Sequence, residues 1–213
     1  TSRQRWAGPA RAGRPRQRLW VIRPKHIILA AGALERPLTF TNNDKPGVML
    51  STAVRGFVNR YAVAPGRRVA IVTTNDDGYC TARDLKAAGV DVAVVADTRQ
   101  ELSETAEQVA SLGISVRAKT MPKKALGGIG VEGIRLQTVN SGAVADYECD
   151  VIAMAGGYNP SIHLLSQGGN KPQWQDEVQG FIAGEGPDAV TTAGACRGVY
   201  DLSDCIAGGV AAG

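Results

Sequence analysis

The sequence predicts an α/β fold that is organised around one βαβ unit with a parallel sheet. Residues 69–72 (VAIV) and 90–95 (VDVAVV) are short apolar runs of strand length, and the second run is mostly β-branched. The intervening helix is indicated by apolar residues at three-residue steps: Ala82, Leu85 and Ala88. Gly89 is well placed to end that helix. A strand, a helix and a second strand in this order form a unit whose two strands lie parallel.

The turn of this unit departs from the glycine pattern that binds a dinucleotide. The pattern is G-x-G-x-x-G, and this chain has Thr73, Asn75 and Gly78 at the three glycine positions. Side chains at the first two positions, and the carboxylates of Asp76 and Asp77, would compete with a pyrophosphate for the helix N-terminus. We therefore expect that the fold is kept and this nucleotide site is lost. A divergent but working site is the alternative.

The second strand of the unit is followed by Asp97, at the place where dinucleotide-binding units carry the carboxylate that holds a ribose hydroxyl. The role of this carboxylate, like that of the turn, depends on whether the nucleotide site of the βαβ unit works. If the site works, removal of the Asp97 carboxylate should weaken the binding of a dinucleotide.

Length and composition favour one large domain or two small ones. The chain has 213 residues, of which 44% are apolar, so it can bury a real core. It contains no apolar run of about 18 residues and no apolar segment at its start, so we expect neither a membrane span nor secretion. The four cysteines form no C-x-x-C pair and are expected to be reduced thiols in a cytoplasmic protein.

The basic residues are concentrated near the N-terminus. Residues 1–25 hold 8 of the 24 bases and no acid, so the remaining 16 bases are outnumbered by all 20 acids. Such a segment can bind nucleic acid. Its glycines and prolines (Gly8, Pro9, Gly13 and Pro15) favour a solvated loop instead, and we expect no nucleic acid as partner.

The segment before the βαβ unit contains a candidate ligand loop. Residues 26–31 (HIILAA) predict a buried strand that ends at Gly32. Loops at the ends of parallel strands are where ligands bind in open α/β sheets, and a glycine there lets a ligand approach the backbone. Glu35 and Arg36 in this loop could bind the ligand or pair with each other. Ser51 is then expected to cap a helix that ends at Tyr61.

The segment after the βαβ unit alternates between strands and short helices. The expected helices cover residues 101–112, 161–165 and 202–212, and Asp201 is expected to cap the last one. The expected strands cover residues 114–116, 127–131, 133–139, 143–148, 149–153 and 189–192. The second of these strands is rich in glycine, and it would form a hairpin with the third.

Three stretches carry a resemblance to a known family. They are RLWVIRPKHIILAAGALERPLTFTNNDKPGVML, VNRYAVAPGRRV and AGACRGVYDLSDCIAGGVAAG. Together with a strand that ends in G-G-Y-x-P, they resemble the alpha subunit of heterotetrameric sarcosine oxidase, from about Gln17 onward. The large subunits of proline and opine dehydrogenases are also similar.

The resemblance implies a fold and a domain organisation. The fold would be a Rossmann-like βαβ domain inserted in part of an FAD/NAD(P)-binding, thioredoxin-reductase-like domain. Residues 1–67, including the basic N-terminal loop, and residues 149–213 would form the flavoprotein-like domain, and residues 68–148 would be the insert.

The resemblance also implies an activity, cofactors and partners. The parent complex oxidatively demethylates sarcosine to glycine and forms hydrogen peroxide. NAD would be bound by the intact alpha subunit, and FAD, FMN and tetrahydrofolate would belong to the intact complex. The beta subunit would be the partner, and an amine would be the substrate.

The cofactor-binding residues implied by the resemblance lie at both ends of the chain. Gly32 and Gly194 would be part of the nucleotide site, and the start of the last helix would point its positive end at a pyrophosphate or flavin. The complete set is Ala31, Gly32, Leu34, Glu35, Arg36, Pro37, Gly194, Asp201 and Leu202. Ala195 stands where flavoproteins of this layout often carry an aspartate for the ribityl chain, which favours NAD over FAD. No catalytic acid, base or nucleophile and no metal site is expected.

The chain differs from the whole subunit in that an intact G-x-G-x-x-G unit and a folate domain are missing. We therefore expect an internal fragment that is inactive alone and whose exposed sheet edges allow self-association. A noncatalytic scaffold for partner subunits is the alternative function.

Overall fold

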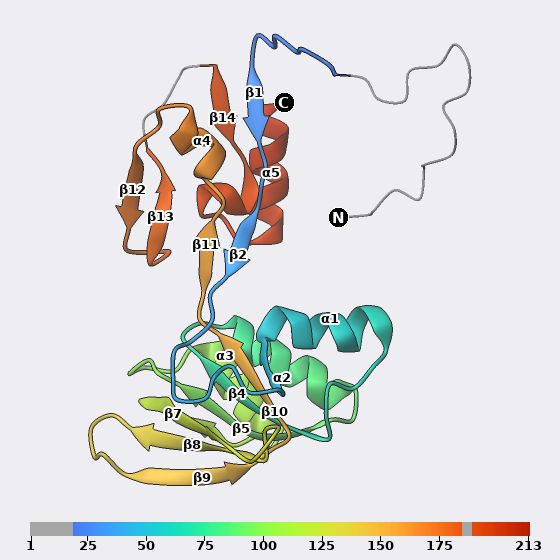
Figure 1. Ribbon diagram of the computed structural model, residues 1–213, viewed down its shortest axis with the longest axis vertical. Helices are drawn as coiled ribbons and strands as arrows, with labels where there is room; N and C mark the ends of the chain where they lie inside the picture. Colours follow the sequence, from blue (N-terminus) through green and yellow to red (C-terminus); the bar gives the residue numbers. More distant parts are fainter. Residues whose placement is uncertain (1–18, 185–188) are drawn as a thin grey trace.

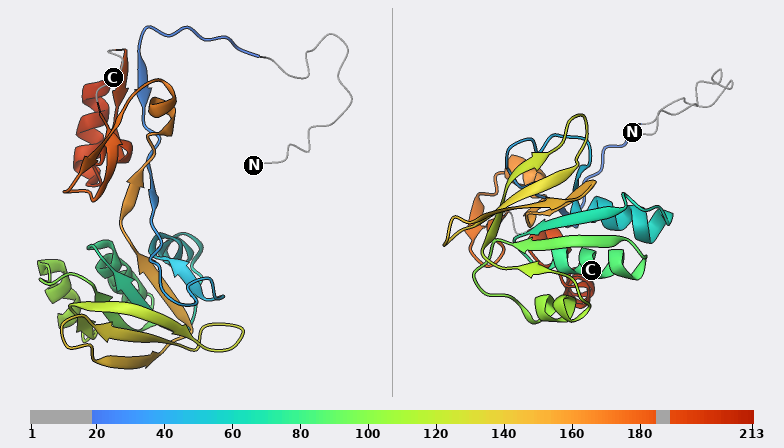
Figure 2. Two further views of the ribbon diagram at one scale, coloured as in Figure 1. Left: turned by 60° about the vertical axis from the view of Figure 1, so that its left-hand side comes forward. Right: turned by 90° about the horizontal axis from the view of Figure 1, so that it is seen from below.

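The computed structural model describes residues 19–184 and 189–213, which form two lobes (Figure 1). Six of the eight basic residues near the N-terminus belong to residues 1–18, so the expected basic loop lies largely outside the described residues. The lobes are joined by a narrow ribbon of two antiparallel strands, β2 (Ala33–Glu35) and β11 (Tyr158–Pro160). The left view of Figure 2 shows this ribbon as the connection between them.

The larger lobe contains a five-stranded parallel sheet in the order β3-β10-β4-β5-β6. Its strands are β3 (Val48–Leu50), β4 (Arg68–Thr73), β5 (Asp91–Asp97), β6 (Val116–Arg117) and β10 (Val151–Ala155). The expected βαβ unit is confirmed as β4, α2 (Asp77–Ala87) and β5. Because β3 and β10 pair into the same sheet, the lobe extends beyond residues 68–148.

The parallel sheet is covered on both faces. The helices α1 (Ser51–Tyr61), α2 and α3 (Glu104–Ser111) lie on one face. An antiparallel meander of β7 (Thr120–Leu126), β8 (Gly133–Thr138) and β9 (Val144–Glu148) lies on the other, as the right view of Figure 2 shows. A parallel sheet needs cover on both faces because its strands are apolar throughout.

The alternation of side chains along β4 shows why that strand is apolar without interruption. Val69 and Ile71 point into the core on the helix side, whereas Ala70 and Val72 point into the core on the meander side. All four are at most 1% exposed. Successive residues of a strand face opposite sides, so a strand between two cores cannot show a polar alternation.

The smaller lobe is built from short elements around a two-stranded parallel sheet. The sheet consists of β1 (Ile27–Leu29) and β14 (Val190–Thr192). The other elements are α4 (His163–Gln167), the hairpin β12 (Pro172–Gln175) with β13 (Gly180–Ala183), the 3₁₀ turn η1 (Gly194–Arg197) and α5 (Leu202–Ala212). Asp201 caps α5 as expected, because its carboxylate accepts the backbone N–H groups of Ser203 and Asp204.

Several expected strands differ from the structure. The expected buried strand 26–31 is only three residues long, and Ile27 and Ile28 are 47% and 45% exposed, because β14 is its only paired strand among the described residues. The expected strand 127–131 is a bend, since Gly127 has φ +118°. Its place in the meander is taken by β7, and the hairpin of β12 and β13 was not expected. The segment expected as a ligand loop after Gly32 contains strand β2.

The helix starts also differ from the expected ones. Ser51 is the first residue of α1 and caps nothing, because its hydroxyl pairs with that of Thr81. The helix expected from residue 101 begins at Glu104, where Ser103 accepts the N–H of Ala106. Helix α4 begins at His163, after Ser161, and has no side-chain cap. No helix in the described ranges is long and apolar enough to cross a bilayer.

Candidate functional site

The C-terminal edge of the sheet in the smaller lobe brings two predicted cofactor-binding glycines to neighbouring strand ends. Leu29 pairs with Thr192, and the N–H of Ala193 donates to the carbonyl of Leu29 at 3.0 Å. Gly32 lies three residues after Leu29, and Gly194 lies two residues after Thr192. We call this the glycine edge, made of residues 31–32 and 193–194. Gly32 and Gly194, 162 positions apart in the chain, thus follow neighbouring strands at one edge.

The backbone at the glycine edge is bare on its open side. Gly32 has φ +73° and Gly194 has φ +69°, conformations that side chains rarely adopt. A Cβ at Gly32 would meet no atom within 4 Å, and a Cβ at Gly194 would meet only Sγ of Cys205, at 3.9 Å. The space beside both backbones is therefore open to a ligand.

Helix α5 follows this edge through η1, and its first N–H groups are occupied by its own cap. Oδ1 of Asp201 accepts the N–H of Ser203 at 2.8 Å and that of Asp204 at 3.2 Å. The hydroxyl of Ser203 also donates to Oδ1 of Asp201, and this bond, together with the two from the backbone, lowers the pKa of the Asp201 carboxyl, so it is charged at neutral pH. Leu202 is 74% exposed and contributes an apolar surface. A ligand anion here would meet the capping carboxylate as well as the helix dipole.

Two other predicted site residues, Glu35 and Arg36, hold the lobes together and do not pair with each other. Glu35 accepts the backbone N–H of Thr52 at 3.0 Å and also its hydroxyl, so it caps α1 of the larger lobe. Burial raises the pKa of Glu35 although the bonds from Thr52 lower it. Nη1 of Arg36 donates to the carbonyl of Gln179 at 2.5 Å. Leu34 is exposed on β2, and Pro37 follows the ribbon.

The turn after β4 in the larger lobe, residues 73–78, is closed by its own side chains. Oγ1 of Thr73 donates to the carbonyl of Asn75 at 2.6 Å and accepts the N–H of Asn75 at 3.2 Å. Oδ1 of Asn75 accepts the N–H of Asp77 at 2.9 Å. Two backbone N–H groups that could bind a phosphate are therefore already bonded within the turn.

The third position of the pattern, Gly78, has the packing role that the sequence assigns to it. A Cβ on Gly78 would lie 2.6 Å from Oγ1 of Thr73. The helix α2 can approach β4 this closely only because residue 78 has no side chain.

The carboxylate expected to hold a ribose is buried and fully bonded inside the protein. Asp97 is 0% exposed and accepts the hydroxyl of Tyr79 at 2.6 Å and the guanidinium of Arg99 at 2.8 Å. The same guanidinium pairs with Asp76 at 2.7 Å, and Ser103 donates to Asp76 at 2.8 Å. We call these five residues the Arg99 network. They occupy the edge of β4 and β5 where a dinucleotide would bind.

Electrostatics keep the guanidinium of Arg99 charged and the phenol of Tyr79 neutral. Desolvation lowers the pKa of Arg99, but its bonds to Asp97 and Asp76 outweigh this effect and raise it. Burial and the bond to Asp97 raise the pKa of Tyr79 above its usual value, so the phenol remains a donor. The sequence analysis missed Tyr79, Arg99 and Ser103. The cation two residues after Asp97 was the one local signal for this pairing.

A cleft of about 260 Å³ lies where the lobes meet in front of α2. Its walls are acidic and aromatic: Asn75, Asp76, Asp77, Gly157, Tyr158, Glu177, Val178 and Tyr200. Tyr158 and Tyr200 stack with ring centroids 5.2 Å apart. Three carboxylates and no cation in this lining disfavour a pyrophosphate at the N-terminus of α2.

Comparison with known proteins confirms the resemblance that the sequence indicates. The chain is 36% identical over 210 residues to the sarcosine oxidase subunit alpha of Corynebacterium sp. (strain U-96). The matched region covers 96% of this chain and 22% of that protein. It is 39% identical over 203 residues to that of Rhizobium meliloti (strain 1021), which covers 92% of this chain and 19% of that protein. The chain therefore spans about a fifth of the length of these relatives. No family model matches the chain.

Solved structures confirm the expected fold class. The thioredoxin reductase of T. acidophilum superposes with a TM-score of 0.68 at 16% identity, covering 88% of this chain and 62% of that chain. The L-proline dehydrogenase of P. horikoshii superposes with a TM-score of 0.59 at 24% identity, covering 81% of this chain and 30% of that chain. The architecture is thus that of thioredoxin-reductase-like FAD/NAD(P)-binding proteins.

Proposed function

We propose that this chain, which resembles sarcosine oxidase alpha subunits over nearly its whole length, is the cofactor-binding portion of such a subunit. The complex would oxidatively demethylate sarcosine to glycine and form hydrogen peroxide, with a beta subunit as partner. The dinucleotide would be NAD and would bind at the glycine edge. The larger lobe would bind no nucleotide and would serve as a scaffold.

The observation that carries this proposal is the pairing of β1 with β14. It places Gly32 and Gly194, both with positive φ and open space beside the backbone, at the ends of neighbouring parallel strands. Ligands of open α/β sheets bind at such carboxyl ends. Ala31 and Gly32 would admit the nucleotide to the backbone, and α5 would direct its N-terminal dipole toward this edge.

The choice of NAD rests on the residue that follows Gly194. Ala195 has no carboxylate to hold a ribityl chain, and its place is inside the 3₁₀ turn η1. The bound nicotinamide would supply hydride chemistry, and the chain itself would supply position and electrostatics. FAD, FMN and tetrahydrofolate would belong to other parts of the complex.

The proposal can be tested by calorimetric titration of the chain with NAD, in wild type and in two matched glycine variants. Gly32→Ala puts a methyl group into the open space of the glycine edge, and we expect it to weaken NAD binding at least about tenfold. Gly89→Ala is the control, because Gly89 has a similar φ of +77° and equally open surroundings but lies at the end of α2. We expect Gly89→Ala to leave NAD binding unchanged.

Two results would contradict the proposal in different ways. Binding that is abolished by Asp97→Asn and unaffected by Gly32→Ala would mean that the βαβ unit of the larger lobe is the working site. Absence of NAD binding, and of nucleotide released from the purified protein in mass spectrometry, would favour the second function, a noncatalytic scaffold for partner subunits. The Arg99 network supports that function for the larger lobe, because it fills the nucleotide edge with internal bonds.

A further inference from the structure

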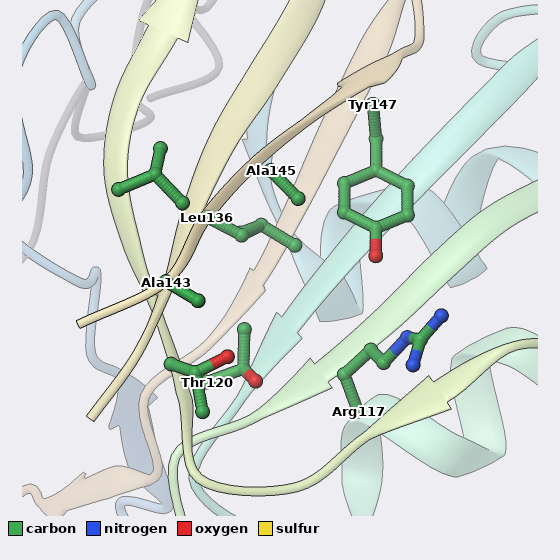
Figure 3. A pocket seen from close by; sticks show the side chains of 8 residues that line it. Arg117, Thr120, Leu136, Ala143, Ala145 and Tyr147 are labelled. Carbon is green, nitrogen blue, oxygen red and sulfur yellow. The ribbon is translucent and has the colours of Figure 1, made fainter. Parts of the chain in front are cut away.

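A small cavity lies between the meander and β6, the last strand of the parallel sheet (Figure 3). Its volume is about 220 Å³. It is lined by Arg117, Thr120, Leu136, Thr138, Ala143, Val144, Ala145 and Tyr147. Arg117 ends β6, and the other lining residues belong to the three strands of the meander and the turn before β9.

The two polar tips of the cavity converge. Figure 3 shows the guanidinium of Arg117 and the hydroxyl of Tyr147 pointing toward one another from opposite walls. No hydrogen bond joins these two groups, and both line the cavity. Among the described residues, Arg117 takes part in no ion pair. An arginine without a partner, next to a phenol that can donate, favours an anionic group with planar oxygens.

The remaining walls consist of two threonines, Thr120 and Thr138, and aliphatic side chains. Leu136 is 2% exposed and belongs to the core below the meander, and Thr120 is also buried. The hydroxyl of Thr120 is already used, because it donates to the carbonyl of Ala118 at 2.8 Å. Leu136 and Ala145 therefore present an aliphatic surface beside the guanidinium and the phenol.

The neighbouring acids do not face this cavity. Side chains alternate along β9, so Asp146 lies on the face opposite to Ala145 and Tyr147. Asp146 is also paired with Arg135 at 2.7 Å. The lining thus contains one cation and no carboxylate, which disfavours both a zwitterion and a multiply charged phosphate ester.

We propose that this cavity binds a short aliphatic carboxylate. Arg117 and Tyr147 hold the carboxylate oxygens, and Leu136 and Ala145 contact the hydrocarbon chain. The site is independent of the glycine edge and of the proposed dinucleotide.

The test is a titration of the chain with butyrate, followed by the amide chemical shifts of the lining residues in NMR spectra. We expect saturable shifts at residues 117, 120, 136 and 147 and a millimolar dissociation constant. Butyramide has the same shape without the charge, and 4-aminobutyrate adds an ammonium group. Each should bind at least about tenfold more weakly, because a hydrogen bond to a charged group contributes more free energy than a tenfold change in the dissociation constant.

Variants separate a built site from general attraction to a basic surface. Arg117→Gln should weaken butyrate binding about tenfold or more, Tyr147→Phe should weaken it about threefold, and Arg117→Lys should retain part of it because the charge remains. Arg60→Gln is the control, because Arg60 is exposed on α1, on the opposite face of the parallel sheet, and should change nothing. Equal shifts with butyramide, shifts scattered over other basic residues, no shifts, or unchanged binding in Arg117→Gln would each overturn the proposal.

Discussion

The glycine edge of the smaller lobe and the turn of residues 73–78 in the larger lobe are the same kind of structure with opposite contents. Both lie at the carboxyl ends of parallel strands in an α/β fold. At the glycine edge, Gly32 and Gly194 leave the backbone bare. At the turn, Thr73 and Asn75 bond the backbone N–H groups that a phosphate would need. The difference teaches that strand ends of the same kind can leave their backbone open or bond it internally.

In the larger lobe, the carboxylate at the ribose position of the βαβ pattern is hydrogen-bonded within the protein. Asp97 is positioned where the βαβ pattern expects it, but Tyr79 and Arg99 saturate it. A buried carboxylate that is paired and hydrogen-bonded is costly to expose. The internal bonds of Asp97 support the proposed loss of this nucleotide site, and the comparison can be tested residue by residue.

The largest effect is expected for Gly78→Ala, which tests whether the one kept glycine of the turn is structural. The added Cβ would lie 2.6 Å from Oγ1 of Thr73, so α2 must move away from β4. We expect a loss of about 3 kcal/mol in the free energy of unfolding, measured by urea denaturation. Gly56→Ala in α1 is the control, because its Cβ meets no atom within 4 Å, and it should stabilise the protein by about 0.5–1 kcal/mol. Equal stability of the two variants would contradict the packing role.

The next largest effect is expected for Arg99→Met, which leaves the buried Asp97 with the hydroxyl of Tyr79 and without its cation. We expect a loss of about 2 kcal/mol in the free energy of unfolding, a value reduced because Arg99 is partly exposed. Urea denaturation measures it. Arg135→Gln breaks an exposed pair with Asp146 and should cause no measurable change. An Arg99→Met variant as stable as wild type would mean that the network does not hold this edge.

A smaller effect is expected for the stability of Gly32→Ala, whose binding role is proposed above. The alanine would have to adopt φ +73°, which costs about 1 kcal/mol. Gly89→Ala should cost the same amount, because its φ is +77° and its surroundings are equally open. Thermal unfolding of both variants checks this. A much larger loss in Gly32→Ala would show that Gly32 is needed for folding, and the binding comparison would then lose its match.

The smallest effect is a pH dependence at the junction of the lobes. The pKa of Glu35 is raised by burial above its ordinary value of 4.5, so the folded protein binds this proton more tightly than the unfolded chain. Glu35 therefore stabilises the fold at low pH, and this contribution falls as the pH rises from 4.5 through the raised pKa. Glu35→Gln should remove that slope. Urea denaturation of both proteins from pH 4 to pH 7 measures it, and a wild-type advantage that grows with pH would be the opposite of this expectation.

The parts of the fold that could be predicted are those specified by local pattern. The strands β4 and β5 follow from unbroken apolar runs, and the helix α2 follows from three-residue spacing. The position of Asp201 as a capping residue predicted the start of α5. Strand β7 was missed because it contains Pro122 and two lysines, and its partner β8 decides its conformation. The prediction that residues 26–31 are buried was wrong. Burial depends on the elements that cover a strand, and the strand's own residues do not specify them.

The candidate site was predictable only in its glycines. Gly32 and Gly194 could be named because each follows an apolar strand, although their meeting at one edge depends on the pairing of β1 with β14. The roles of Glu35 and Arg36 could not be inferred from their adjacent positions. Glu35 bonds to Thr52 in the larger lobe, whereas Arg36 bonds to Gln179 in the smaller lobe. Likewise, Asp97 could be placed at a strand end, but its partners Tyr79 and Arg99 become visible only in three dimensions.

The ribbon of β2 and β11 has a consequence for how such a molecule can be assembled. The N–H of Arg36 donates to the carbonyl of Gly157 at 2.8 Å, and the N–H of Gly156 donates back to the carbonyl of Arg36 at 3.2 Å. Residues 37–155 therefore leave and re-enter the smaller lobe at one bonded pair. In topological terms the ribbon is a β-hairpin whose turn is an entire lobe, so the chain enters and leaves that lobe through one pair of adjacent strands.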